Sequence, residues 1–210
     1  TRVESSAASD VYKRQGNIGT KLLSRKIFNN ISKKFGNNIK YWDKGQVSIC
    51  WPGYPRKDDK ETIKSFNFRI KRFESHIDGI IPFGKKKRRF AKEFHAFILG
   101  FPLQNNCLES APLVLWEGSH KIFRNFFKEI YEGITSDKIS SIDITELYSE
   151  CRKKVFKNCE VKKITPQFKQ PYLLDRHVLH GIDVWPEKKN VKYNPKNNML
   201  SNNLSDGRTI

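Results

Sequence analysis

Long hydrophobic runs are missing from this chain of 210 residues. No segment reaches the roughly 18–20 consecutive apolar residues that a membrane-spanning helix requires. The start of the sequence also shows no charged segment followed by an apolar one, the pattern of a secretory signal. These absences argue against a helical membrane protein, and a cytosolic location is the default expectation.

Cysteine is scarce and scattered. The four cysteines, Cys50, Cys107, Cys151 and Cys159, include no C-x-x-C pair. Their spacing excludes a zinc ribbon and favours reduced thiols. The H-E-x-x-H motif of zinc hydrolases does not occur either.

Acidic residues are the minority, with 22 Asp and Glu against 40 Lys and Arg, which gives a formal net charge of +18. A field of this size can attract nucleic acid, anionic lipid or an acidic substrate. Lys, Asn, Ile and Phe are all abundant, however, as AT-rich codons would make them. We therefore interpret most of the charge as codon bias that leaves a solvated basic surface. The run Lys85–Arg89 fits a solvated loop, with the steering of an anionic substrate as the alternative.

The first fifteen residues differ in character from the rest. The segment SSAASDVYKRQ, Ser5 to Gln15, reverse-translates in one frame to the transposase adapter used for sequencing libraries. Its last codons, GAT-GTG-TAT-AAG-AGA-CAG, encode Asp10 to Gln15. We therefore expect residues 1–15 to be a translated sequencing adapter, and we exclude them from the fold prediction.

Apolar residues at helical spacing predict three amphipathic helices in a chain that is 37% hydrophobic and 12% aromatic. The first covers Lys21–Phe35, and the second begins at a Ser119 cap. The third starts at Asp143, with Glu146 completing a capping box. This third helix is expected to bury Leu147, Tyr148, Cys151 and Val155.

Short apolar stretches of strand length lie on both sides of the second and third helices. They read QVSICWPGYP, SFNFRIKRF, HAFILGFPL, APLVLWEG, VKKITP and QPYLLDRHVLHG. The segments Gly79–Arg89 and Pro186–Asp206 are rich in glycine, charge or asparagine and are predicted to be loops. The pattern favours a mainly β fold, a curled sheet with flanking helices.

A histidine and an aspartate lie two residues apart in SHIDG, residues 75–79. On a strand, residues i and i+2 point to the same side, so His76 and Asp78 can bind one metal ion together. A non-haem iron(II) centre uses two imidazoles and one carboxylate and leaves its other positions open. His180 is a candidate third ligand, because it ends a strand-like segment and Gly181 permits close backbone approach. H-x-D alone is a weak signal that also arises by chance.

The motifs HIDGIIPFG, HAFILGFPL, APLVLWEGSHKIF, LLDRHVLHGIDVW and DGRTI follow one another along the chain. In order and spacing they resemble the phytanoyl-CoA dioxygenase-like branch of the iron(II)/2-oxoglutarate oxygenases, over Trp42–Ile210. The resemblance implies a double-stranded β-helix, that is, a jelly-roll or cupin-like barrel. It also implies that His76, Asp78 and His180 bind iron(II).

The same resemblance implies a reaction. An enzyme of this family would use 2-oxoglutarate and O2 to hydroxylate a small organic substrate, which can be anionic, and would release succinate and CO2. Arg208 would bind the distal carboxylate of 2-oxoglutarate, because a guanidinium can donate two parallel hydrogen bonds. Asp78 favours hydroxylation, since related iron halogenases carry a small residue in its place.

Arg208 departs from the spacing that is common in the family. It lies farther beyond His180, so that residues 186–205 would have to loop out, and the chain stops two residues later. On this interpretation the chain ends within a strand. We therefore expect residues 16–210 to be a single oxygenase domain that is truncated at both ends.

Three further histidines were weighed. His95 begins the HAFILG segment and is a candidate to face the cosubstrate, with a hydrogen-bonded core histidine as the alternative. His177 lies three residues before His180, and this odd offset turns it to the opposite face of a strand. His120 follows Ser119 at a helix start, where turn chemistry is its simplest role.

An alternative from another class is a non-catalytic basic β-barrel module that binds nucleic acid or another polyanion. Such a module would bind in a salt-dependent manner and would be indifferent to His76→Ala. We place nucleic acid below a small-molecule substrate, because the sequence has no basic stretch interleaved with aromatic residues of the stacking type.

Overall fold

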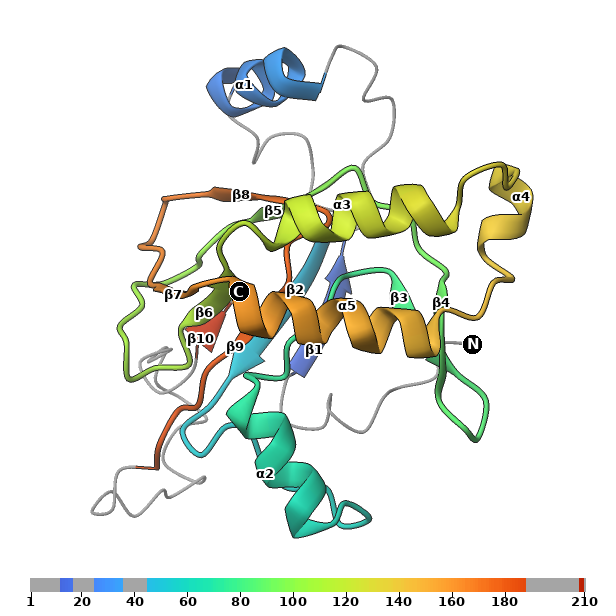
Figure 1. The fold of residues 1–210 in the computed structure, drawn as a ribbon. Helices are drawn as coiled ribbons and strands as arrows, with labels where there is room; N and C mark the ends of the chain where they lie inside the picture. Colours follow the sequence, from blue (N-terminus) through green and yellow to red (C-terminus); the bar gives the residue numbers. More distant parts are fainter. Residues whose placement is uncertain (1–11, 17–24, 36–44, 188–207, 210) are drawn as a thin grey trace.

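A computed structural model describes residues 12–16, 25–35, 45–187 and 208–209 of the chain (Figure 1). This part mixes helices with short antiparallel strands. In chain order the elements are β1 (Tyr12–Gly16), α1 (Arg25–Phe35), β2 (Gly45–Cys50), α2 (Ile63–Lys71), β3 (Ile80–Phe83), β4 (Arg88–Ala91), β5 (Phe97–Gly100), β6 (Leu113–Trp116), α3 (Ser119–Ile130), α4 (Ser136–Ile139), α5 (Thr145–Asn158), β7 (Val161–Ile164), β8 (Tyr172–Asp175), β9 (His180–Ile182) and β10 (Arg208–Thr209). Figure 1 shows α3 and α5 side by side in front of the strands.

Three of the antiparallel strand pairs are nested along the chain: β2 with β10, β5 with β8, and β6 with β7. An isolated antiparallel bridge between His76 and His180 falls inside the first pair and outside the second. In this set each pair encloses the next, as in a long hairpin that is folded over on itself. Outside this nested set, β1 pairs with β2, β3 with β4, and β9 with the other edge of β6.

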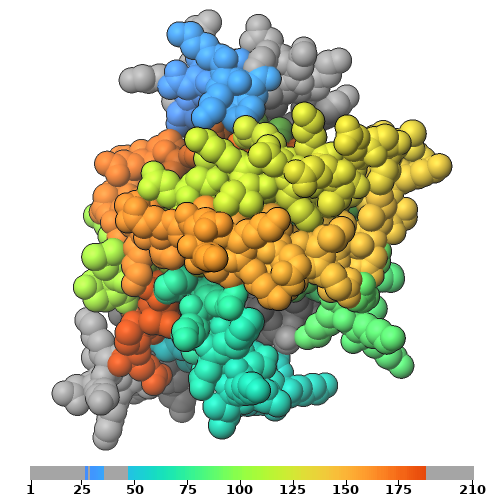
Figure 2. All heavy atoms as spheres, viewed as in Figure 1, coloured from blue at the N-terminus to red at the C-terminus, as the bar shows by residue number. Residues whose placement is uncertain are grey.

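The main hydrophobic core lies between α3, α5 and the sheet in which β6 pairs with β7 and β9. Phe123 of α3 is fully buried, and its ring centroid lies 5.7 Å from that of Tyr148 in α5. Val114 and Trp116 of β6 complete the contact from the sheet side. Burial of each such side chain contributes about 1.5–3 kcal/mol. The two helices, which cover this face in Figure 2, thereby stabilise the sheet that carries His180.

The three predicted helices are present as α1, α3 and α5, but the prediction for the start of α3 is wrong. Gly118 occupies the N-cap position, and no side chain caps the helix there. Ser119 lies in the first turn and is buried, where its Oγ accepts the backbone N–H of Leu179 at 2.9 Å. Within the described ranges, no helix combines the length and apolar character of a membrane span.

The capping box predicted at Asp143 does not form. Asp143 Oδ1 accepts the N–H of Thr145 at 3.0 Å, and α5 begins only there. Glu146 then lies in the first turn and binds Arg88 instead, at 2.6 Å from Arg88 Nη2. Leu147 is 53% exposed, whereas the three other residues predicted to be buried are buried. Tyr148, Cys151 and Val155 share one helix face at i, i+3 and i+7, and Leu147 lies off that face.

Most of the segment SFNFRIKRF belongs to the helix α2, so the strand suggested by its alternating Phe66, Phe68 and Ile70 is wrong. Thr62 caps the helix, with its Oγ1 accepting the N–H of Ser65 at 3.2 Å. None of the α2 residues is buried. The alternating aromatic and aliphatic residues therefore do not form the buried face of a sheet. The Thr62 cap favours a helix here instead.

The segment Gly79–Arg89, predicted to be a loop, contains β3, the turn and the first two residues of β4, which form a hairpin. Phe83 pairs with Arg88 in its register, so the basic run Lys85–Arg89 covers the turn and the start of β4. The other predicted loop, Pro186–Asp206, lies outside the described residues beyond position 187.

β1 pairs with β2 in antiparallel register from Tyr12 opposite Ile49 to Gly16 opposite Gly45. Four of its five residues belong to the segment 1–15 that we interpret as adapter-derived. The pairing of β1 with β2 does not test whether residues 12–15 are adapter-derived, because any sequence can form backbone hydrogen bonds. That origin therefore stays a prediction.

Candidate metal centre

His76 and His180 face each other across an antiparallel bridge. The N–H of His76 donates to the carbonyl of His180 at 2.8 Å, and the N–H of His180 donates back at 3.1 Å. Residues opposite each other in such a bridge place their side chains on the same side. The two imidazole centroids are accordingly 4.7 Å apart.

Asp78 completes the group from two residues further along the chain. Its Oδ1 lies 3.2 Å from His76 Nε2 and 3.7 Å from His180 Nε2. One ligand atom from each side chain lies within 4.8 Å of the other two, so the three residues form a group that can hold a metal ion. The structure thus brings together the three residues that the sequence predicted as ligands.

Both imidazoles are oriented by backbone carbonyls. His76 Nδ1 lies 3.0 Å from the carbonyl oxygen of Glu74, and His180 Nδ1 lies 3.0 Å from that of Val178. Each Nδ1 must carry the proton to donate these hydrogen bonds, which leaves Nε2 unprotonated in the neutral ring. The two Nε2 lone pairs face Asp78, the arrangement that second-shell hydrogen bonds produce in metal sites.

The charges of the group favour a cation among the three side chains. Burial acts to raise the pKa of Asp78, but a protonated His76 donates from Nε2 to its carboxylate and a protonated His180 adds positive charge, and these effects hold that pKa well below its usual range. Burial lowers the pKa of His180, and the charge of a protonated His76 lowers it further against the opposing charge of Asp78, which favours the neutral imidazole. A neutral imidazole and an ionised carboxylate are the protonation states that metal binding requires. The donor set, two nitrogens and one oxygen, fits iron(II).

Two glycines allow the ligand segments to approach other backbone. A Cβ on Gly181 would meet the carbonyl oxygen of Phe73 at 2.0 Å. Gly79, directly after Asp78, has a φ of +83°, and a Cβ there would meet the carbonyl oxygen of Glu93 at 2.1 Å. The prediction that Gly181 permits close approach beside His180 is confirmed.

Helix α5 supports the backbone on both sides of His76. Tyr148 Oη accepts the N–H of Ile77 at 3.2 Å. Arg152 Nη2 donates to the carbonyl oxygen of Ser75 and to its Oγ, both at 2.9 Å. The residues on either side of His76 are therefore hydrogen-bonded to one face of α5. Helical spacing predicts that Tyr148 is buried, but nothing in it indicates these bonds.

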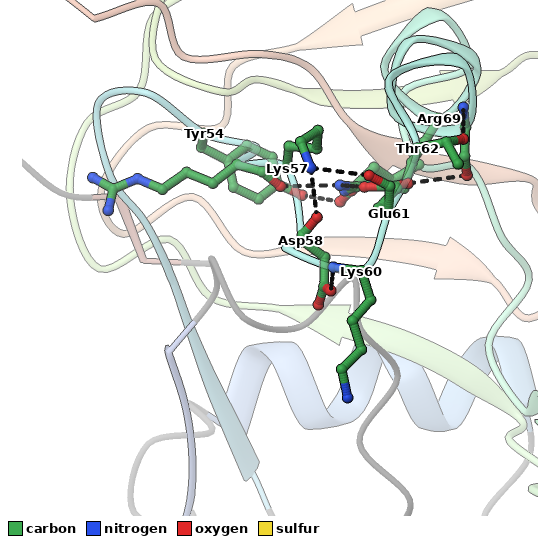
Figure 3. A network of polar contacts seen from close by, with 10 residues as sticks. Tyr54, Lys57, Asp58, Lys60, Glu61, Thr62 and Arg69 are labelled. Carbon is green, nitrogen blue, oxygen red and sulfur yellow. Dashed lines mark hydrogen bonds and ion pairs between the residues drawn. The ribbon is translucent and has the colours of Figure 1, made fainter.

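A network of polar side chains supports Glu74, whose carbonyl orients His76. The Tyr54 hydroxyl donates to the Glu74 carboxylate, and Arg69 of α2 forms an ion pair with the same group. Arg69 also donates to both carboxylate oxygens of Glu61, at 2.7 Å and 3.1 Å (Figure 3). Lys57 Nζ donates to the Glu61 carbonyl at 2.9 Å. These contacts connect the start of α2 to Glu74, which lies two residues before His76.

His95 and His177 lie outside the ligand group but line one cavity of about 110 Å³, which Asp78 also lines. His95 Nε2 is 3.5 Å from Glu93 Oε2. Its positive charge, when present, contributes to the low pKa of Asp78. The role of His95 toward a cosubstrate stays a prediction. His177 is not part of the ligand group, but it lies in the turn between β8 and β9 and not on a strand, so the prediction that it faces the opposite side of a strand does not hold.

Arg208 is placed by its backbone, which pairs with Cys50 of β2. Its side chain lies outside the described residues. The predicted contact with a cosubstrate carboxylate is therefore a prediction still.

The basic run Lys85–Arg89 is divided by the hairpin. Lys85, Lys86 and Lys87 are exposed at the turn. Arg88 instead binds the carboxylates of Asp143 and Glu146, and the backbone N–H of Arg89 donates to Thr145 Oγ1 at 2.7 Å. At least one charge of the run thus has a structural role, in joining β4 to the start of α5.

Comparisons of the chain with protein-family models, with curated proteins and with solved structures find no match. What the site can do therefore follows from its own geometry.

Proposed function

We propose that this protein is an iron(II)- and 2-oxoglutarate-dependent dioxygenase that hydroxylates a small organic molecule and releases succinate and CO2. The group of His76, Asp78 and His180 carries the proposal. It unites two imidazoles and one carboxylate, the donor set of non-haem iron(II) oxygenases.

The nested strand pairs support a jelly-roll fold for the proposed enzyme. A jelly roll forms when a long antiparallel hairpin rolls up, so that the first strand pairs with the last and each inner pair follows in turn. The pair β2–β10, the His76–His180 bridge, β5–β8 and β6–β7 follow this order. The two histidines then belong to the second pair, which also explains their closeness.

The chain supplies ligand geometry and protonation states in this proposal. When bound, iron(II) supplies the redox chemistry that activates O2. His76 and His180 present their Nε2 atoms because Glu74 and Val178 accept their Nδ1 protons. Asp78 contributes the negative charge and occupies the position that a halide would need, which favours hydroxylation. The side chain of His76 is half-exposed, so the group can be reached from solvent.

Arg208 and His95 complete the proposal on the cosubstrate side. Arg208 would bind the distal carboxylate of 2-oxoglutarate through its guanidinium. His95 lines the cavity beside Asp78 and is near enough to influence its pKa. It is therefore the other candidate to face the cosubstrate.

An anaerobic titration with iron(II) and 2-oxoglutarate tests the proposal. We expect the weak visible absorption band of the iron(II)–2-oxoglutarate chelate in the unaltered protein, its loss in His76→Ala and its weakening in Arg208→Ala. His120→Ala is the matched control, because this histidine belongs to α3 and lies outside the ligand group. The control should keep the band.

A folded protein that shows no band, with His76→Ala identical to the unaltered chain, would contradict the proposal. The basic binding module would then be the function to test. It predicts polyanion binding whose affinity falls steeply with salt and is unchanged in His76→Ala.

A further inference from the structure

The hairpin of β3 and β4 carries apolar side chains on the face that points away from the core. Ile80 pairs with Ala91, and both are buried. The next pair, Ile81 with Phe90, points to the opposite face, because successive residues of a strand alternate. Phe83 shares this outer face and is 63% exposed. Polar residues are typical of the outer face of a hairpin that covers a core, so an apolar outer face indicates a surface that contacts a partner.

Phe83 and Phe90 form an edge-to-face pair near the tip of the hairpin. Their ring centroids are 6.3 Å apart and their planes meet at 89°. Lys92 Nζ lies over both rings, 5.9 Å from the centroid of Phe83 and 5.2 Å from that of Phe90. The pair therefore lacks the flat, open ring faces on which bases stack. Its shape suits insertion between apolar chains.

Positive charge without a counterion surrounds the exposed ring. Residues 85–87, all lysines, form the turn and are exposed. Among the residues that the structure describes, no carboxylate forms an ion pair with any of the three. Asp143 and Glu146 contact the hairpin, but Arg88 binds both of them. An anionic partner would therefore meet three free ammonium groups beside Phe83.

The hairpin is held in place at its base and projects from the rest of the molecule. Figures 1 and 2 show its tip at the lower right of the view. The N–H of Ile144 donates to the carbonyl of Arg89 at 3.0 Å, and the N–H of Arg89 donates to Thr145 Oγ1 at 2.7 Å. These bonds join β4 to the start of α5, so the tip is already ordered before it meets a partner, which reduces the entropy cost of binding.

We propose that the tip of the β3–β4 hairpin, made of Phe83 and the three lysines of the turn, docks on the surface of an anionic lipid bilayer. The Phe83 ring enters between the acyl chains at the interface, and the ammonium groups lie among the anionic headgroups. The inference is independent of the proposed function. Ile80 and Ala91, on the buried face of the same hairpin, line the cavity beside Asp78, so docking holds this cavity close to the bilayer.

Sedimentation of the full chain with lipid vesicles tests this inference. We expect binding to vesicles of equal parts phosphatidylcholine and phosphatidylserine, and none to vesicles of phosphatidylcholine alone. Phe83→Ala should weaken the binding by about tenfold, as partial burial of one phenyl ring implies. Replacement of Lys85, Lys86 and Lys87 by glutamine should weaken it by about a hundredfold, since each lysine near an anionic bilayer contributes about fivefold.

Two matched controls separate the hairpin tip from exposed aromatic residues and from net charge in general. Phe168→Ala removes a ring that is 49% exposed and has Lys169 Nζ 5.2 Å from its centroid, but that lies outside the hairpin. Replacement of Lys121, Lys128 and Lys138 by glutamine removes the same charge from exposed positions on α3 and α4. Both controls should keep most of the affinity for the anionic vesicles.

The inference is overturned if the folded protein does not bind the anionic vesicles, or if the hairpin variants bind them like their controls. It is also overturned if a single-stranded oligonucleotide binds more tightly than the vesicles and loses this binding in Phe83→Ala, because the tip would then be a stacking site. The iron(II) titration separates these results from the proposed function. An iron(II)–2-oxoglutarate band without vesicle binding removes the inference alone, whereas vesicle binding without the band removes the oxygenase alone.

Discussion

His76 and His180 exchange two backbone hydrogen bonds, so the peptide groups that join their segments also determine the spacing of their imidazoles. The ligand group is therefore part of the strand pairing and not an addition to it. Any change that separates the two segments should weaken metal binding and stability together.

Metal binding should stabilise the folded chain. A ligand that binds only the native state at a concentration of 100 times its Kd raises the free energy of unfolding by about 2.7 kcal/mol. We expect the Tm to rise when iron(II) is added without oxygen, and to return when a chelator removes the metal. The rise should vanish in Asp78→Asn, which lacks the anionic ligand. An equal rise in Asp78→Asn and in His120→Ala would contradict the assignment of the site.

Gly181→Ala should separate β9 from the chain that precedes His76. The new Cβ would lie 2.0 Å from the carbonyl oxygen of Phe73, a backbone atom that cannot rotate away. We expect a loss of about 3 kcal/mol or more in chemical denaturation, with weaker metal binding. Gly84→Ala is the control, because its φ of +71° is strained but no atom lies within 4 Å of the new Cβ. That variant should lose only about 1–2 kcal/mol and keep its metal affinity.

Two of the candidate ligands could be predicted from a local pattern, and the third from the glycine that follows it. His76 and Asp78 are two residues apart, and Gly181 after His180 marks a close approach that the structure confirms. Strand pairing was beyond prediction. The register that puts His180 opposite His76 depends on the whole nested set of pairs, which no short stretch of sequence specifies.

Supporting residues were missed for a different reason. Tyr148 follows a helical pattern that indicates burial, but its hydroxyl bond to Ile77 depends on the position of another segment. Glu74 follows SFNFRIKRF, whose alternation suggested a strand, whereas the cap at Thr62 starts a helix. Alternation indicates a strand only where one face is buried, and no residue of α2 is buried.

Tyr148→Phe should weaken metal binding, although Tyr148 is not one of the candidate ligands. The substitution removes the acceptor for the N–H of Ile77, next to His76, and leaves that buried donor without a partner. We expect a loss of about 1–3 kcal/mol in the free energy of unfolding. Metal affinity, measured by calorimetry, should fall as well, because Ile77 lies between the two ligands. An unchanged metal affinity at reduced stability would show that Tyr148 acts on the core alone.

The stability of the protein should fall as the pH is lowered from 6.5 toward 4, in part because of His177. Burial lowers the pKa of His177 from 6.5 to about 4 in the folded state. Between these values the unfolded chain binds a proton that the folded chain does not, so the free energy of unfolding rises with pH. The contribution is complete above pH 6.5 and is lost as the pH falls through 4. Its full size is about 3 kcal/mol by the conversion of pKa shifts into energy.

Urea denaturation of the unaltered protein and of His177→Gln at several pH values measures this contribution. The variant should show a flatter dependence between pH 4 and 6.5, because glutamine binds no proton. Burial also lowers the pKa of His180, so the variant should keep part of the slope. Asp143, whose pKa its hydrogen bond with Arg88 lowers to about 2, titrates in a more acidic range and leaves this window unaffected. Parallel curves for the two proteins would mean that His177 is protonated as readily in the folded chain as in the unfolded one.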